Sequence, residues 1–220
     1  MYNIIPIEQV RNKIDGETFD YSQLMSALSS YSKPRDTVTT LLKRGHILRV
    51  RKGLYVFGPV WRRVPVNTEP LANLVYGPSS ISLDFALAAY GLIPERVNVI
   101  TSVTNGRSRE FDTPEGRFTY THLSGIRFST GIALQGSTGS RFFISEPLKA
   151  LADKVWTDSR FKPVSAGSYA DYLFSDLRID EDTLASYIRT DRINVIKHAY
   201  ATRKISWLME YLLKRFNSVL

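Results

Sequence analysis

The sequence contains no cysteine, so it has neither a disulfide framework nor a thiolate metal site. It also lacks the roughly 20 consecutive apolar residues that a transmembrane helix requires, because its longest apolar run covers only residues 85–93. No basic segment followed by an apolar one, as in a signal peptide, opens the sequence. These absences predict a cytoplasmic protein that does not enter a membrane.

Motifs of catalysis are missing as well. The three histidines, His46, His122 and His198, are isolated from one another, and none lies at metal-ligand spacing. The sequence has no glycine-rich phosphate loop and no Gly-x-Ser-x-Gly motif. Asp112 and Glu115 flank a Pro-Glu-Gly turn, so we expect them to be turn residues. The sequence therefore favours a protein that is not an enzyme and that uses no metal or cofactor.

What the sequence does have is clustered positive charge. The 220 residues are 43% hydrophobic, enough for a buried core, and carry a net charge of +8. Residues 1–66 hold 11 Lys/Arg against 5 Asp/Glu, and within them 33–63 holds nine cations against Asp36 alone. Such a cluster attracts polyanions and suits the phosphate backbone of nucleic acid. A solvated basic face that only improves solubility is the alternative.

Apolar residues at helical spacing predict three helices in the first third of the chain. Asp20 is a capable N-cap for the second helix. Pro34 has the fixed φ that suits the first turn of the third helix, and Gly45 provides its C-terminal stop. The predicted helices cover residues 6–14, 20–30 and 34–45.

The third helix has a polar face of unusual composition. Opposite the apolar stripe that includes Val38 and Leu41, it presents Thr39, Thr40 and Lys43. Threonine is a mediocre helix former, so helix propensity does not explain two of them on an exposed face. Hydroxyls and cations are the groups that bond to phosphates and base edges, which predicts contact with nucleic acid.

A basic hairpin follows the third helix. Arg49 and Arg51 alternate with apolar residues up to a Lys52-Gly53 turn, which predicts a β-hairpin over residues 46–57. Three helices followed by a hairpin are the order of a winged helix-turn-helix, whose third helix enters the major groove while the hairpin lies along phosphates. Two alternatives stay open: the module binds protein, or the hairpin charges only protect an edge strand.

We therefore predict that residues 1–66 bind double-stranded DNA through three groups of exposed side chains. The groups are Ser32, Lys33 and Arg35 for phosphates at the start of the third helix; Thr39, Thr40, Lys43 and Arg44 for the major groove; and Arg49, Arg51 and Lys52 in the hairpin.

Prolines and a glycine near residues 62–67 mark a boundary, so the predicted domains are 1–66 and 67–220. The second domain alternates helical and β-type patterns and then becomes helical, which predicts an α+β fold with a small, mainly antiparallel sheet and C-terminal helices. The apolar stripe of 203–216 is expected in the core of this chain rather than in a partner's groove. The predicted strands are 97–103, 109–113, 116–123, 131–136 and 140–145, and the predicted helices are 69–77, 82–91, 146–156, 168–177, 181–190, 191–200 and 203–216.

Four segments, taken together, have a familiar order: GLYVFGPVWRR, GPSSISLDFALAAYGLIPE, GRFTYTHL and FFISEPLKALAD. They resemble the AbiEi-type antitoxins, the abortive-infection family of type IV toxin-antitoxin systems and related transcriptional regulators. The resemblance runs to about Asp153, roughly two thirds of the chain. One departure is Leu148, which stands where relatives carry a glutamate, so no role of that glutamate transfers to this chain.

The resemblance implies an N-terminal winged helix that binds promoter DNA and represses its own operon. It also implies a second domain that counteracts a cognate nucleotidyltransferase toxin, without requiring a stable complex with it. Two other functions remain open. One is a stand-alone winged-helix regulator whose second domain senses a ligand or oligomerises; the other is a nucleic-acid enzyme, which the missing catalytic clusters disfavour.

Overall fold

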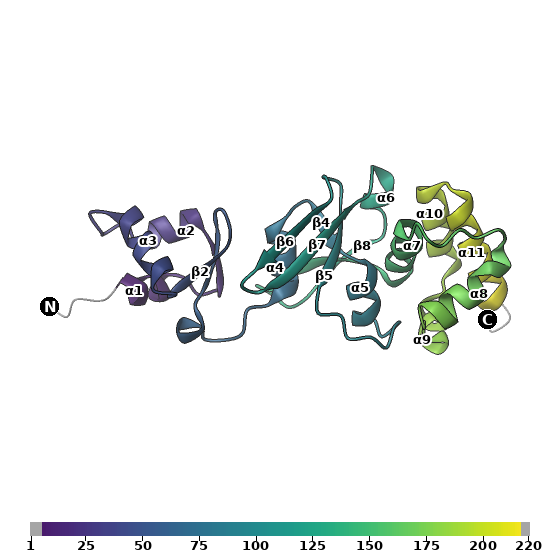
Figure 1. Cartoon of the computed structure of the whole chain (residues 1–220), viewed down its shortest axis with the longest axis horizontal. Helices are drawn as coiled ribbons and strands as arrows, with labels where there is room; N and C mark the ends of the chain where they lie inside the picture. Colours follow the sequence, from purple (N-terminus) through teal and green to yellow (C-terminus); the bar gives the residue numbers. More distant parts are fainter. Residues whose placement is uncertain (1–5, 217–220) are drawn as a thin grey trace.

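The structure is a computed structural model that describes residues 6–216. It is α+β, and its described residues form eleven α-helices and two sheets of three and six strands. Figure 1 shows an elongated arrangement, with the N-terminal helices and small sheet at one end, the larger sheet in the middle, and the C-terminal helices at the other end.

Three helices and a hairpin form the N-terminal part, as the sequence predicts. Helix α2 begins with a reciprocal cap, because Gln23 N donates to Asp20 Oδ1 and Asp20 N donates to Gln23 Oε1, at 2.8 Å each. Helix α3 begins at Pro34, and Gly45 follows it with a φ of +66°. The elements are α1 (Pro6–Lys13), β1 (Thr18–Asp20), α2 (Tyr21–Ala27), α3 (Pro34–Lys43), β2 (Ile47–Arg51) and β3 (Leu54–Phe57).

The small sheet has the strand order β1-β3-β2, and both of its pairs are antiparallel. The predicted hairpin is confirmed, with Gly53 at a φ of +85° in its turn. Strand β1 was not predicted from the sequence. At three residues it is too short to show a period-2 pattern.

Strand β3 is the central strand of this sheet, and all four of its residues are buried. Tyr55 and Phe57 join the core made by α1, α2 and α3. Leu54 and Val56, which alternate with them, join a second and larger core that continues to the C-terminal helices. Because successive side chains of a strand point to opposite faces, the hairpin belongs to both cores at once.

The larger sheet is mixed: three of its five strand pairs are antiparallel, in line with the predicted mainly antiparallel sheet, but its two parallel pairs were not predicted. Its strand order is β6-β7-β5-β4-β9-β8, and the pairs β4–β9 and β5–β7 are parallel. Strand β4 and the short helices η1 and α6 were not predicted. The elements are η1 (Pro59–Trp61), α4 (Thr68–Val75), β4 (Ser79–Ile81), α5 (Leu83–Ala89), β5 (Ile100–Thr104), β6 (Arg109–Thr113), β7 (Gly116–His122), α6 (Ile126–Ser129), β8 (Ile132–Gln135) and β9 (Phe142–Ser145).

Helix α7 connects the sheet to the C-terminal helices, because it packs against α5 as well as α10 and α11. Leu208 and Leu212 of the α11 stripe are fully buried in the larger core, which confirms the predicted role of the stripe. No helix within 6–216 is both long and apolar enough to cross a bilayer. The elements are α7 (Pro147–Thr157), η2 (Ala166–Ser168), α8 (Tyr169–Asp171), η3 (Tyr172–Asp176), α9 (Glu181–Tyr187), α10 (Thr190–Tyr200) and α11 (Arg203–Phe216).

A buried ion pair holds the sheet, α7 and α10 together. Lys149 and Asp153 lie one turn apart on α7, both side chains are fully buried, and Lys149 Nζ is 2.5 Å from each carboxylate oxygen. The hydroxyl of Ser82 donates to Asp153 Oδ2 at 2.6 Å, and the hydroxyl of Tyr200 donates to Oδ1. Burial lowers the pKa of Lys149, while the nearby Asp153 acts in the opposite direction. Lys149, Ser82 and Tyr200 therefore depend on one carboxylate.

Replacing that carboxylate tests the network. Asp153→Ala leaves the Lys149 ammonium buried without a partner, and we expect the free energy of unfolding to fall by about 3–5 kcal/mol. Lys154→Ala on the same helix is the control, because its ion pair with Asp84 is partly exposed and should contribute less than about 1 kcal/mol. Urea denaturation followed by circular dichroism measures both, and equal losses would contradict the role of the buried pair.

Candidate nucleic-acid interface

Helix α3 presents the face that the sequence predicts. Val38 and Leu41 are buried against the N-terminal core. Thr39, Thr40 and Lys43 on the other side are exposed. The structure also leaves the other predicted DNA-binding residues exposed: Ser32, Lys33, Arg35, Arg44, Arg49, Arg51 and Lys52.

The hydroxyl hydrogens of the two exposed threonines are already donated in hydrogen bonds within the helix. Thr39 Oγ1 donates to the Arg35 carbonyl oxygen at 3.2 Å, and Thr40 Oγ1 donates to the Asp36 carbonyl oxygen at 3.0 Å. These bonds to the preceding turn fix the hydroxyl direction and leave the oxygen lone pairs as acceptors. In a major groove such an oxygen can accept from the amino group of adenine or cytosine, and the threonine methyl can contact the methyl of thymine.

The first turn of α3 offers backbone donors beside two cations. Lys33 is the N-cap residue but makes no side-chain bond to the helix, so the Arg35 and Asp36 amides have no side-chain cap. Lys33 and Arg35 lie next to these amides and form no ion pair with any carboxylate in residues 6–216. An uncapped helix N-terminus with flanking cations is suited to phosphate.

The C-terminal end of α3 adds two more cations. Lys43 is in the last turn and Arg44 is the C-cap residue. Neither is ion-paired within the described part of the chain. Positive charge is favourable at this end of a helix, and both side chains are free for an external anion.

The structure divides the three cations of the hairpin. Lys52 lies exposed in the turn, and the Arg49 guanidinium is 5.9 Å from the centre of the Tyr55 ring. Arg51 instead donates from Nη1 to the carbonyl oxygen of Val75, at the end of α4. Sequence alternation predicted the exposure of these residues but not the bond of Arg51 to a carbonyl oxygen 24 residues later in the chain.

Two further cations of the basic segment have internal partners. Arg62 pairs with Glu115 in the β6–β7 turn, and both side chains are largely buried. Arg63 donates from Nη2 to the carbonyl oxygen of Arg11 at 3.2 Å. Glu115 is a turn residue, as predicted, and it also holds the segment after the hairpin against the larger sheet, whereas Asp112, expected in the same turn, lies in strand β6. No local sequence signal indicates a partner 53 residues away.

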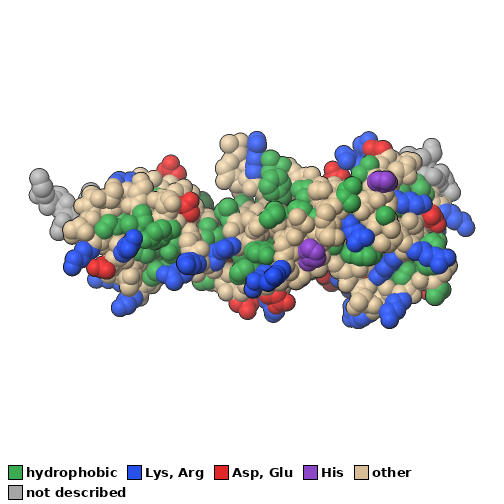
Figure 2. Space-filling model, turned by 90° about the horizontal axis from the view of Figure 1, so that it is seen from above, with side chains coloured by type: hydrophobic (Ala, Val, Ile, Leu, Met, Phe, Trp, Pro, Cys, Tyr) green, Lys and Arg blue, Asp and Glu red, His purple; other side chains and the backbone are tan. Residues whose placement is uncertain are grey.

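On the face in view, charge alone does not distinguish the N-terminal part from the rest. Figure 2 shows Lys and Arg side chains along the whole length of the face in view, with fewer Asp and Glu among them. The interface is therefore defined by the composition and geometry of α3.

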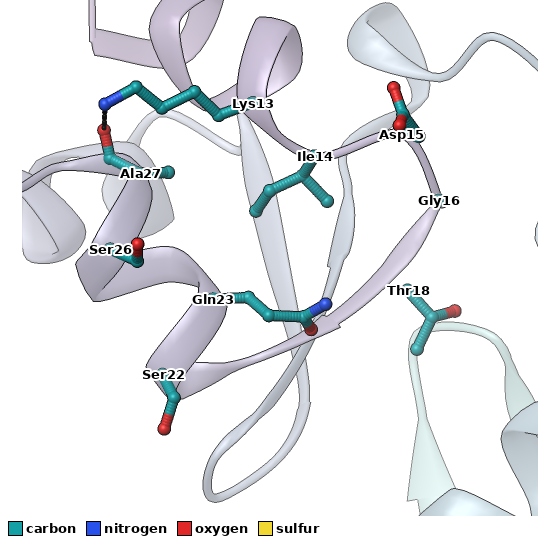
Figure 3. A pocket seen from close by; sticks show the side chains of 9 residues that line it. All are labelled: Lys13, Ile14, Asp15, Gly16, Thr18, Ser22, Gln23, Ser26 and Ala27. Carbon is teal, nitrogen blue, oxygen red and sulfur yellow. Dashed lines mark hydrogen bonds between the residues drawn. The ribbon is translucent and has the colours of Figure 1, made fainter.

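The N-terminal part also contains a hollow of about 570 Å³ between the end of α1, β1 and α2 (Figure 3). Lys13 lies at its rim and donates from Nζ to the Ala27 carbonyl oxygen at 3.2 Å. Its lining contains one carboxylate, that of Asp15, and no histidine. This composition does not supply the paired acid and base of a hydrolytic site.

The histidines remain apart in the structure. His46 makes an edge contact with Trp61, with 5.6 Å between ring centres, and His122 Nδ1 lies 2.7 Å from the Gly106 carbonyl oxygen. His198 is exposed on α10. Between residues 6 and 216, no three His, Asp or Glu side chains converge in a group that could hold a metal ion.

No protein-family model matches the chain, and no curated protein matches its sequence significantly. The function is therefore inferred from the residues of this chain.

The bond of Arg51 to Val75 separates its role from that of Lys52. Arg51→Ala leaves the Val75 carbonyl without this donor, and we expect the free energy of unfolding to fall by about 1 kcal/mol. Lys52→Ala removes an exposed side chain of the turn and should change it by less than about 0.5 kcal/mol. Chemical denaturation of the two variants measures the difference, and an unchanged stability of Arg51→Ala would show that the bond contributes nothing.

Proposed function

We propose that the N-terminal part is a winged helix-turn-helix that binds double-stranded promoter DNA. The observation that carries the proposal is the exposed face of α3, on which acceptor-only threonine hydroxyls lie between cations that have no internal carboxylate partner. The order of three helices and a hairpin supports it, since that is the order in which this class of domain places its third helix in the major groove.

Each group of residues has a distinct role in this proposal. Lys33 and Arg35, with Ser32, bind backbone phosphates at the start of α3. Thr39 and Thr40 face base edges, and the cations that follow them on α3 contact bases and phosphates. In the hairpin, Arg49 and Lys52 face the backbone, whereas we assign Arg51 mainly to holding the hairpin on α4. Because the target is genomic DNA, the proposal includes a cytoplasmic location.

The salt dependence of binding tests the interface. Lys43→Ala removes one phosphate contact, so the slope of log K against log salt concentration should become shallower by about one unit on any duplex. Lys162→Ala, an exposed lysine in the C-terminal part, is the matched control and should leave the slope unchanged. Fluorescence anisotropy with the duplex upstream of the gene and with an unrelated duplex measures both.

A second variant in the same assay separates base reading from attraction to the backbone. Thr39→Val keeps the shape of the side chain but removes its acceptor, so it should weaken binding to the upstream duplex more than to the unrelated one. Equal salt slopes for Lys43→Ala and the wild-type protein, together with no effect of Thr39→Val, would remove α3 from the interface.

We further propose that residues 67–220 counteract a nucleotidyltransferase toxin, which makes the protein an antitoxin that represses its own operon. This part of the proposal rests on the resemblance of four sequence segments to the AbiEi-type antitoxins, and not on a site in the structure. The second candidate is a stand-alone regulator. The shared core favours this candidate. Leu54 and Val56 of the hairpin are buried in the larger core, so a change in the second part could move the hairpin.

Co-expression with the product of the neighbouring gene, which the antitoxin proposal requires to be a nucleotidyltransferase, distinguishes the two candidates. The full chain should restore growth, and the double variant Lys43→Ala/Arg44→Ala should restore it equally, because the substituted residues lie outside 67–220. Full-length variants are preferable to a fragment that starts at 67, since such a fragment would lose the hairpin residues of the larger core. A failure of soluble full-length protein to restore growth would leave the stand-alone regulator.

A further inference from the structure

The two edges of the larger sheet differ in charge. Strand β6 forms one edge and carries Arg109, Glu110 and Asp112, of which the two acids pair with Arg117. It also packs against β2. Charged side chains and a covering element are the usual means by which a protein blocks pairing at a sheet edge. The β6 edge is therefore protected.

Strand β8 forms the other edge and has no such protection. Residues 128–140, which contain β8 and the loop after it, include no charged residue, although 23% of the whole chain is charged. Leu134 on this strand is 52% exposed, and Phe143, its cross-strand partner on β9, is 49% exposed. An exposed apolar edge strand without charges is a template for a further strand.

The register shows which backbone groups of β8 are open. Glu146 N donates to the Gly131 carbonyl oxygen at 2.8 Å, so these two residues form a hydrogen-bonded pair. Hydrogen-bonded pairs alternate along an antiparallel ladder, so Ala133 bonds to β9 while the N–H and C=O groups of Ile132 and Leu134 point away from it. The bond from Phe143 N to Asn73 Oδ1 agrees, because Phe143 faces away from β8 as this register requires.

Beside this edge lies an apolar groove of about 580 Å³. Its lining includes Leu74 from α4, Phe128 from α6, and Ile132 and Phe143 from the β8–β9 hairpin. Leu74 is 55% exposed. Because Ile132 and Leu134 lie two residues apart, their side chains share the face of β8 that carries Phe143. A strand added at the edge would therefore bring its own side chains onto the same apolar surface.

We propose that this edge pairs with β8 of a second copy of the chain, which joins two six-stranded sheets into one continuous sheet. An antiparallel pair centred on Ala133 places Ile132 opposite Leu134 of the copy and Leu134 opposite Ile132 of the copy. The outward N–H and C=O groups of both residues are then satisfied reciprocally, as a two-fold axis requires. The small Ala133 side chain lies at the axis, where the two strands approach most closely.

The edge carries no charge, so it is self-complementary and suits a second copy. The net charge of +8 makes two copies repel each other, and their contact is least unfavourable on a surface that adds no charge of its own. The segment 128–140 is such a surface. In a two-fold symmetric pair, the Arg141 residues of the two copies lie at opposite ends of the paired strands and so stay apart. An edge built for a charged partner would carry complementary charges, and this one has none. The inference does not depend on DNA binding or on an antitoxin role.

Sedimentation equilibrium of the full chain at low and high concentration tests the proposal. The wild-type protein should approach twice the chain mass of 25.0 kDa as its concentration rises. Leu134→Lys puts a charge on the exposed edge and should weaken dimerisation by at least about tenfold, because the charge would be buried without a partner. Val195→Lys, which adds the same charge at a 50% exposed site on α10, is the control and should dimerise like the wild type.

Amide hydrogen exchange measured by NMR gives an independent readout. The amides of Ile132 and Leu134 should exchange quickly in dilute protein and slowly in concentrated protein, whereas those of Ala133 and Gln135 should be protected in both. A wild-type protein that stays monomeric at every concentration would overturn the proposal. A different protein would then be the candidate partner of the β8 edge. A Leu134→Lys variant that dimerises like the wild type would overturn it as well, because the dimer would then use another surface.

Discussion

The burial of β3 on both faces is the constraint on which the arrangement of the N-terminal half depends. Tyr55 and Phe57 pack on the three N-terminal helices, and Leu54 and Val56 pack into the larger core. Each fully buried side chain of this kind stabilises the fold by roughly 1.5–3 kcal/mol, so separating the hairpin from either core would expose a substantial apolar surface. The bond from Arg51 to Val75 and the ion pair of Arg62 with Glu115 reinforce the same junction. A displacement of the hairpin would therefore also disturb its contacts with the larger sheet.

The same junction explains why the basic segment has two kinds of cations. Arg62 is largely buried and lies beside a carboxylate, and the Arg51 guanidinium bonds to the end of a helix, so both stabilise the fold. Lys33, Arg35 and Lys43 instead lie on an exposed surface of the protein. Only solvent or an external anion can neutralise their charges there. Net charge counts both kinds equally. The charge of Arg62 is offset by Glu115, whereas Arg51, which bonds to a neutral carbonyl, and the second kind of cation both contribute to the field that a polyanion meets as it approaches the protein.

The larger sheet combines a polar interior with two unlike edges. Near its centre, the carboxylate of Asp153 binds Lys149, Ser82 and Tyr200 and so connects the sheet to α7 and α10. That network is satisfied and closed to solvent, which suits a structural role. The β6 edge is charged and packs against the hairpin of the N-terminal part, while the β8 edge is apolar and open. The N-terminal part and the proposed partner copy thus use different edges of the sheet.

Local signals in the sequence determined the helices α1 to α3, the hairpin and the buried stripe of α11, because caps, turn glycines and apolar periodicity act over a few residues. They also determined which side of α3 faces solvent. They could not show β1 or β4, since three-residue strands carry no periodicity and form only where a longer strand offers a partner. The parallel pairs of the larger sheet, the partner of Arg62 and the open groups of β8 were decided by tertiary structure alone. Each depends on which distant segments meet, and packing of the whole chain selects those contacts.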